Sequence, residues 1–336
     1  MKSLATRPVA GSVDELLAGA EHREPMVAAD SKSGARFEPV VLGGQSLILK
    51  HLHVDDDWIM RSTGDLTGRA IEVWRAGILD ALPECIDHAV VGAASGLGRN
   101  GWGGALLMRD VASHLVPEGD EPVSLAQHLG FLDHMAALHG AFLGWSDTVG
   151  LTPATHRYLE FSPHCVRFEA ATGWPDAVPR IIMDGWDRFA PLAGELAGPV
   201  ADLLVDPEPL VDALGTCPQT LLHGDWKMGN LGTLPSEQTI LLDWAVPGQG
   251  CPPLDLAWYL SLNAARIPQP KQDAIDAYGA SLERHGVRTD GWFERAMDLA
   301  LLGAVVWFGW EKALGGPGPE LEWWLERGAD GIQQLG

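Results

Sequence analysis

The residues of this chain best suited to chemistry lie between positions 223 and 243. Asp225 and Asn230 belong to the segment His223-Gly-Asp-Trp-Lys-Met-Gly-Asn230, and Asp243 ends a second apolar run. Two apolar strands that each end in an Asp predict a β-hairpin with both carboxylates at one rim. Such oxygens suit Mg²⁺, a hard cation that also takes oxygens from a phosphorylated substrate. The alternative is that these side chains form turns by accepting bonds from local backbone donors.

The segment resembles the catalytic region of the aminoglycoside phosphotransferase and choline kinase family, which has the bilobal protein-kinase-like fold. The resemblance rests on His223-Gly-Asp225-x-x-x-x-Asn230, on Leu-Asp243-Trp, and on Gly250-Cys-Pro-Pro-Leu-Asp255-Leu-Ala257. It would cover most of the chain. It implies an enzyme that moves the γ-phosphate of ATP to a hydroxyl of a small molecule with the help of Mg²⁺.

The resemblance also implies a role for each motif residue. Asp225 would orient the acceptor hydroxyl and receive its proton, while Asn230 and Asp243 would hold magnesium. Asp255 would brace the catalytic loop, and His223 would fix the loop geometry. Lys227 is placed where protein kinases often carry a lysine that meets the transferring phosphate, and the alternative is an exposed lysine with no role.

Lys50 is the candidate for nucleotide binding in the N-terminal part of the chain. It lies between Ile48 and Leu52 in an apolar segment, where an unpaired lysine would be costly. Glu72 is the only acidic residue between Leu66 and Leu79. Since kinases of this fold use a strand lysine paired with a helix glutamate to position nucleotide phosphates, we predict a Lys50–Glu72 ion pair.

Four further patterns bear on ligand binding. Met108-Arg-Asp-Val111 resembles the hinge of the family, so backbone groups of Met108 and Val111 are predicted to contact adenine. Gly96-x-Gly98-x-x-Gly101 matches a dinucleotide-binding pattern, but strand-like residues follow it instead of a helix, so we predict a hairpin turn. In kinases of this fold the phosphate-covering loop precedes the strand lysine, so it is predicted near residues 41–45, before Lys50. His51 and His53 have no third ligand at suitable spacing, and no zinc site is predicted.

The elements that must position these residues fall into two regions. Residues 1–112 predict a β-rich N-lobe with strands at 46–54, 88–93 and 105–111 around one helix at 67–82, of which Ile71, Trp74, Ile78 and Leu82 form one apolar face. Residues 113–336 predict a helical C-lobe that begins with the capping box Ser124-x-x-Gln127 and contains the catalytic hairpin, 220–225 with 239–244. Later helices are expected at 253–263, 272–285, 292–314 and 320–327. The predicted fold class is α+β, bilobal and protein-kinase-like.

Composition narrows the class of protein. The 336 residues are 46% apolar, which is typical of a globular chain, and the formal charge of −22 disfavours binding to nucleic acid or to anionic lipid. The longest apolar run has twelve residues, 299–310, too short for a membrane helix, and residues 1–24 do not resemble an export signal. The four Cys are widely spaced. We therefore expect a cytoplasmic protein with reduced cysteines; its oligomeric state is not predicted.

The sequence thus predicts a small-molecule kinase that uses ATP and Mg²⁺. Two rivals are a pseudokinase that binds nucleotide without transfer and an oxidoreductase that uses the Gly96 motif. Residues 113–336 hold 12 basic and 30 acidic side chains, which fits a cationic acceptor such as an aminoglycoside, an amino sugar or an amino alcohol, although a solvated acidic surface gives the same sum. Acceptor candidates on the late helices are Trp307, Trp310, Glu311, Glu320 and Glu322; the alternative is core tryptophans and solvated glutamates.

Overall fold

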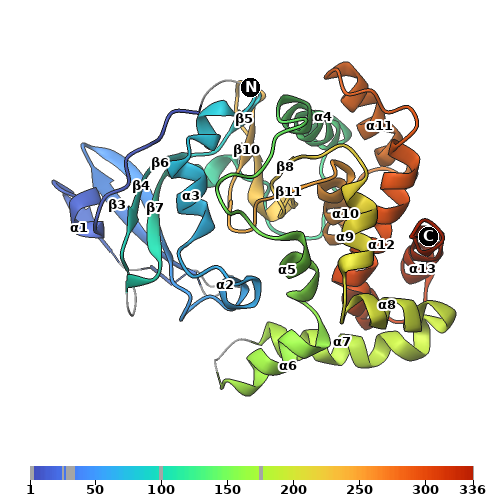
Figure 1. Cartoon of the computed structure of the whole chain (residues 1–336). Helices are drawn as coiled ribbons and strands as arrows, with labels where there is room; N and C mark the ends of the chain where they lie inside the picture. The colour runs from blue at the N-terminus through green and yellow to red at the C-terminus, as the bar shows by residue number, and fades with distance from the viewer. Residues whose placement is uncertain (1–3, 25, 28–34, 98–100, 174–176, 336) are drawn as a thin grey trace. The chain divides into compact units, whose positions relative to one another are not determined.

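The protein consists of two compact units in a computed structural model that describes residues 4–24, 26–27, 35–97, 101–173 and 177–335 (Figure 1). Unit 1 comprises Met1–Gly119, Thr148–Thr152 and Met228–Pro247. Unit 2 comprises Asp120–Asp147, Pro153–Lys227 and Gly248–Gly336. The predicted N-lobe, residues 1–112, lacks two later segments that belong to unit 1, Thr148–Thr152 and Met228–Pro247.

Unit 1 is built on an antiparallel sheet with the strand order β1-β3-β4-β7-β6, to which β2 adds by pairing with β3. The turn between β3 and β4 is Gly43-Gly44, and both glycines have positive φ, which suits a two-residue hairpin. The strands are β1 (His22–Arg23), β2 (Met26–Val27), β3 (Arg36–Leu42), β4 (Gln45–Leu52), β6 (Val90–Ser95) and β7 (Gly104–Arg109).

The helix predicted over residues 67–82 is shorter than expected. It forms α3 (Arg69–Arg75) and a separate 3-10 turn, Ile78–Ala81, because Gly77 between them adopts a left-handed φ of 70°. Ile71, Trp74 and Ile78 are buried, as their helical spacing predicts. The other helical segments of unit 1 are α1 (Val13–Leu16), α2 (Trp58–Thr63), and the 3-10 turns Ala112–His114 and Met228–Asn230.

The predicted catalytic hairpin is wrong in its pairing. In unit 1, β10 (Thr239–Leu241) pairs with β9 (Leu231–Thr233) on one side and with β5 (Ile86–Asp87) on the other. In unit 2, β8 (Thr220–Leu222) pairs with β11 (Gly248–Gly250). The prediction missed β9 because the strand is only three residues long and directly follows a 3-10 turn.

Unit 2 is helical apart from β8 and β11, and α12 packs against α7, α10 and α13. Ser124 caps α4 by accepting a bond from the Gln127 N–H, as predicted. Among the described residues no helix has the length and apolar character needed to cross a membrane. The helices are α4 (Leu125–Ala141), α5 (Ala154–Leu159), α6 (Pro163–Ala171), α7 (Val178–Leu192), α8 (Ala197–Leu203), α9 (Glu208–Gly215), α10 (Pro253–Leu262), α11 (Lys271–Arg284), α12 (Phe293–Leu314) and α13 (Pro319–Ile332), with 3-10 turns at Gly194–Leu196 and Ala264–Arg266.

Candidate functional site

In unit 1 the structure brings Lys50 and Asp243 together, although 193 positions separate them in the sequence. Lys50 lies in β4 opposite Phe37 of β3 and Leu106 of β7, and it is only 6% exposed. Its Nζ donates to Asp243 Oδ1 at 2.6 Å. A buried ammonium is costly without a partner, so this carboxylate stabilises the charge inside the sheet.

Asn230 belongs to the same end of the β9–β10 hairpin as Asp243. The Leu242 N–H donates to the Asn230 carbonyl oxygen at 2.9 Å, directly beyond the pair Leu241 and Leu231. Asp243 follows Leu242 with a left-handed φ of 62°, which turns the chain at this point. The hairpin therefore carries one amide and one carboxylate at one end.

These oxygen donors fit Mg²⁺ in their chemistry, since that ion is usually held by one or two protein oxygens, phosphate oxygens and water. Among the described residues no group of three or more His, Cys, Asp or Glu side chains could hold a metal. The Nε2 atom of His51 lies 3.1 Å from Glu38 Oε1 in a side-chain pair.

The predicted ion pair between Lys50 and Glu72 is not formed. Glu72 instead pairs with Arg75, one helical turn further along α3. Neighbours at i and i+3 on a helix meet readily, so a local basic residue takes this carboxylate.

Asp57 is a second carboxylate whose charge interacts with both Lys50 and Asp243. It caps α2, where its Oδ1 accepts bonds from the N–H groups of Ile59 and Met60. Burial raises the pKa of Asp57 to about 6. Asp57 and Asp243, rather than Glu72, are therefore the acids that act on Lys50.

The predicted hinge lies beside a small apolar cluster of unit 1. Met108 is the penultimate residue of β7, opposite Ile48 of β4, and the Val111 carbonyl accepts a bond from the His114 N–H. Val111 packs with Ala89 and Ile240, and Met108, Leu115, Leu234 and Leu242 pack against this cluster. Leu242, the neighbour of Asp243, thus packs against this cluster. The cluster is an apolar surface of the kind on which the ring of a nucleotide base can pack.

In unit 2, Asp255 braces the loop that follows β8. Its carboxylate accepts backbone N–H bonds from His223 and Gly224, each at 2.8 Å, and also contacts His139 Nε2 at 3.2 Å. Burial alone would raise the pKa of Asp255, but these hydrogen bonds and the nearby imidazoles outweigh it and hold that pKa below its usual range. An ionised carboxylate at the start of α10 therefore fixes the loop backbone.

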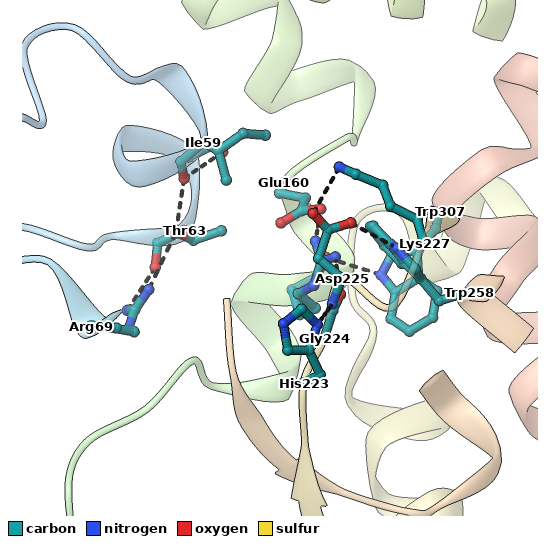
Figure 2. Close-up of polar contacts among 12 residues, drawn as sticks. Ile59, Thr63, Arg69, Glu160, His223, Gly224, Asp225, Lys227, Trp258 and Trp307 are labelled. Atoms are coloured by element: carbon teal, nitrogen blue, oxygen red, sulfur yellow. Dashed lines mark hydrogen bonds and ion pairs between the residues drawn. The ribbon is translucent and has the colours of Figure 1, made fainter. Parts of the chain in front are cut away.

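The loop presents Asp225, which is 9% exposed and bonded through both oxygens (Figure 2). Trp258 Nε1 donates to Oδ1 at 2.9 Å, and Lys227 Nζ donates to Oδ2 at 2.7 Å. The Asp225 N–H donates to His223 Nδ1 at 3.2 Å, which agrees with a geometric role for that histidine. Asp225 is thus an oriented carboxylate with a cation beside it.

Comparison with solved structures identifies the fold. The chain matches a microcompartment-associated aminopropanol kinase over 95% of its own length and 94% of that chain, with 14% identity and a TM-score of 0.52. The chain has the fold of this kinase. It is also similar to a choline kinase from Streptococcus pneumoniae (13% identity, 96% and 95% covered, TM-score 0.47) and to an aminoglycoside phosphotransferase from Streptomyces rimosus solved with ADP and streptomycin (17%, 87% and 96%, 0.48). No family model and no curated protein matches the chain.

Sequence reasoning missed two residues of this kinase-like fold, Arg157 and Trp258. Trp258 follows Asp255 by three positions on α10, and this spacing on one helix face could have indicated it. Arg157 lies 67 residues before Gly224, whose carbonyl oxygen accepts a bond from its Nη2 at 2.7 Å. No local pattern in the sequence marks Arg157.

The acceptor candidates divide into two groups. Trp307 is buried in α12, and its indole N–H donates to the Arg157 carbonyl oxygen. The indole N–H of Trp310 donates to the Trp307 carbonyl oxygen, so both indole N–H groups are bonded to the protein backbone. Glu320 pairs with Lys271, and Glu311 pairs with Lys312. Glu322 is exposed. The alternative of core tryptophans fits Trp307, and two of the three glutamates already have cationic partners.

The remaining patterns are resolved as follows. Gly96 and Gly101 lie in the connection between the antiparallel strands β6 and β7, which agrees with a hairpin and not with a helix-bound dinucleotide. Gly98 lies outside the described residues. The predicted phosphate-covering loop, residues 41–45, is the turn between β3 and β4. All four cysteines are free thiols.

Proposed function

We propose that this chain is a small-molecule kinase of the aminoglycoside phosphotransferase and choline kinase family, which transfers the γ-phosphate of ATP to a hydroxyl group with Mg²⁺. The observation that carries the proposal is the 2.6 Å bond between Lys50 and Asp243. The sequence motifs assign Lys50 to the nucleotide phosphates and Asp243 to the metal that neutralises them. Both roles require the two side chains to lie at the same phosphates.

The unit 1 residues would bind the nucleotide. Lys50 would exchange its bond with Asp243 for phosphate oxygens, and Asn230 and Asp243 would hold Mg²⁺, which supplies charge neutralisation at the phosphates. Backbone groups at Met108 and Val111 would contact the adenine edge, against the apolar cluster around Val111 and Ile240.

The unit 2 residues would act on the acceptor. Asp225 would accept a hydrogen bond from the attacking hydroxyl, orient its lone pair and take its proton as the new P–O bond forms and the bond from the γ-phosphorus to the β–γ bridging oxygen breaks, which releases ADP. Lys227 would stabilise the negative charge of the transferring phosphate, and its present bond to Asp225 Oδ2 places its ammonium beside the carboxylate.

The proposed acceptor is an amino alcohol or amino sugar derivative. The solved structures of similar fold are described as kinases of aminopropanol and choline and as phosphotransferases with streptomycin or hygromycin B. Residues 113–336 hold 30 acidic against 12 basic side chains, which favours the approach of a cation.

The test measures the release of ADP from ATP by the wild-type protein, with and without MgCl₂. Aminopropanol, choline, streptomycin and hygromycin B are each added as the acceptor. We expect Mg²⁺-dependent ADP release that one acceptor class stimulates, and a decrease in kcat of about 10²–10⁴-fold in Asp225→Ala. Binding of Mg²⁺ and ATP without transfer to any acceptor would favour a pseudokinase, and undiminished transfer by Asp225→Ala would exclude the assigned role.

A further inference from the structure

Asp225 is held from outside its own loop by the side chain of Trp258. The indole Nε1 of Trp258 donates to Asp225 Oδ1 at 2.9 Å, and the ring is packed on Phe161, Trp307 and Phe308. Trp258 is 4% exposed, so its indole has little freedom to turn away. Figure 2 shows the indole beside the Asp225 carboxylate. One carboxylate oxygen is therefore fixed by a rigid donor.

Arg157 of α5 supports the same loop from a second side. Its guanidinium carbon lies 3.8 Å from the centre of the Trp258 ring, and its Nη2 donates to the Gly224 carbonyl oxygen at 2.7 Å. It therefore contacts both the indole that bonds Asp225 and the peptide unit that precedes Asp225. Cation–π contact of a buried guanidinium with Trp is favourable and also fixes the plane of the ring.

Glu160, the residue that directly follows α5, balances the charge of Arg157. The two form an ion pair, and Glu160 is completely buried. Burial lowers the pKa of Arg157 to about 10, which leaves the guanidinium charged at neutral pH. A buried charge pair is retained at a cost in desolvation, so its presence beneath the loop calls for a reason other than stability.

We propose that Trp258 and Arg157 are positioning residues for Asp225: Trp258 fixes Oδ1, Arg157 fixes the ring and the loop backbone, and Oδ2 is thereby directed to the acceptor hydroxyl. The inference rests on the proposed function for its catalytic consequence. Its physical basis is that a carboxylate with one oxygen bonded to a rigid donor loses rotational freedom, which keeps the other oxygen in a productive orientation. The charged or titratable groups near this carboxylate include Lys227, which donates to Oδ2, and Arg157, Glu160, His223 and Asp255 (Figure 2).

The first test replaces Trp258 with Phe, which keeps an aromatic ring and removes the N–H donor. The matched control is Trp186→Phe in α7, because Trp186 is also buried and its Nε1 donates to the Phe161 carbonyl oxygen at 2.7 Å instead of to Asp225. We expect kcat to decrease about 10- to 100-fold in Trp258→Phe with the KM for ATP within about twofold, and no such decrease in the control.

Removal of Arg157 alone would leave Glu160 buried and unpaired, so the variant that tests it is Arg157→Gln with Glu160→Gln. We expect this double variant to show the same pattern as Trp258→Phe, a lower kcat of about 10-fold with the KM for ATP within about twofold. If the wild-type protein is active and both Trp258→Phe and the double variant keep the wild-type kcat, the inference is overturned and the proposed function stays intact.

A second measurement does not depend on phosphate transfer. In protein labelled with ¹⁵N at tryptophan, the Nε1–H signal of Trp258 is identified by its loss in Trp258→Phe. We expect this signal to shift in Asp225→Asn while the Trp186 signal stays in place. A Trp258 signal that Asp225→Asn does not move would overturn the inference even if the enzyme is active. An inactive wild-type protein would overturn the proposed function, and the indole signal would still decide whether Trp258 holds Asp225.

Discussion

The candidate residues of unit 1 and those of unit 2 are held in place by different means. Lys50 Nζ donates to Asp243 Oδ1, and Asp243 keeps a side chain that is 31% exposed. Asp225 is bonded through both oxygens, and Asp255, Arg157 and His223 fix the loop around it. Under the proposed function, the groups that would exchange partners when phosphates and a metal bind are paired with each other, whereas the group that would orient a hydroxyl is fixed in advance by the protein.

This difference predicts where the effects of substitutions appear. Substitutions at the Lys50–Asp243 pair should change the affinity for nucleotide, because under the proposed function they remove groups that would bind its phosphates and metal. Substitutions around Asp225 should change the rate of transfer or the stability of the loop, because those contacts are internal to unit 2.

The largest effect on stability is expected for Asp255→Ala in unit 2. The carboxylate is 1% exposed and accepts two backbone N–H bonds that would lose their acceptor. We expect the free energy of unfolding to decrease by about 3–5 kcal/mol, measured by urea unfolding, and Asp255→Asn, which keeps one acceptor oxygen, to lose less. A loss below about 1 kcal/mol in Asp255→Ala would show that the loop does not depend on this brace.

The pH dependence of stability should have opposite signs in the two units. Burial raises the pKa of Asp57 in unit 1 to about 6, so its contribution is present below about pH 4 and is lost as the pH rises through 6. Burial lowers the pKa of His128 in unit 2 to about 4, so its contribution is present above about pH 6.5 and is lost as the pH falls through 4.

Urea unfolding between pH 4 and 7 measures both contributions, each at most about 3 kcal/mol. Asp57→Asn keeps the cap of α2 and should abolish the decrease above pH 4, whereas His128→Gln should abolish the decrease below pH 6.5. If both variants follow the wild-type pH profile, neither group titrates as its burial indicates.

A smaller effect, on binding alone, is expected for Lys50→Met in unit 1. Loss of the ammonium should weaken ATP binding about 10- to 100-fold, measured by calorimetry, because a charge-assisted bond to the phosphates is lost. Wild-type affinity in this variant would remove Lys50 from the nucleotide site.

The smallest effect is expected for Glu72→Gln, since Glu72 pairs with Arg75 and not with Lys50. We expect ATP affinity within about twofold of wild type in the same titration. A loss as large as that of Lys50→Met would restore the predicted Lys50–Glu72 pair in the nucleotide-bound protein.

The sequence predicted the parts of this fold that local patterns determine. The N-cap at Ser124 and the burial of Ile71, Trp74 and Ile78 are confirmed, although Leu82 of the same predicted face is only half-buried, and Lys50 has the acidic partner that its apolar surroundings require. The identity of that partner could not be derived, because it depends on how strands distant in the sequence pair. The same limit explains the wrong hairpin.

Arg157 and Trp258 were missed for the same physical reason, because their contacts join positions that are distant in the sequence. Arg157 contacts Trp258 across about a hundred positions, and the pairing of β8 with β11 spans a segment that also contains β9 and β10. Gly77, in contrast, was a readable signal, since a glycine in the middle of a helical pattern often adopts a left-handed φ and ends the helix.

The most direct test of the division between the two units is calorimetric titration of ADP with Mg²⁺ into wild type, Asp225→Asn and Asp243→Asn. We predict that Asp225→Asn binds with wild-type affinity and that Asp243→Asn binds at least about 10-fold more weakly, because only Asp243 would hold the metal. The reverse pattern, weak binding by Asp225→Asn with wild-type binding by Asp243→Asn, would contradict the account.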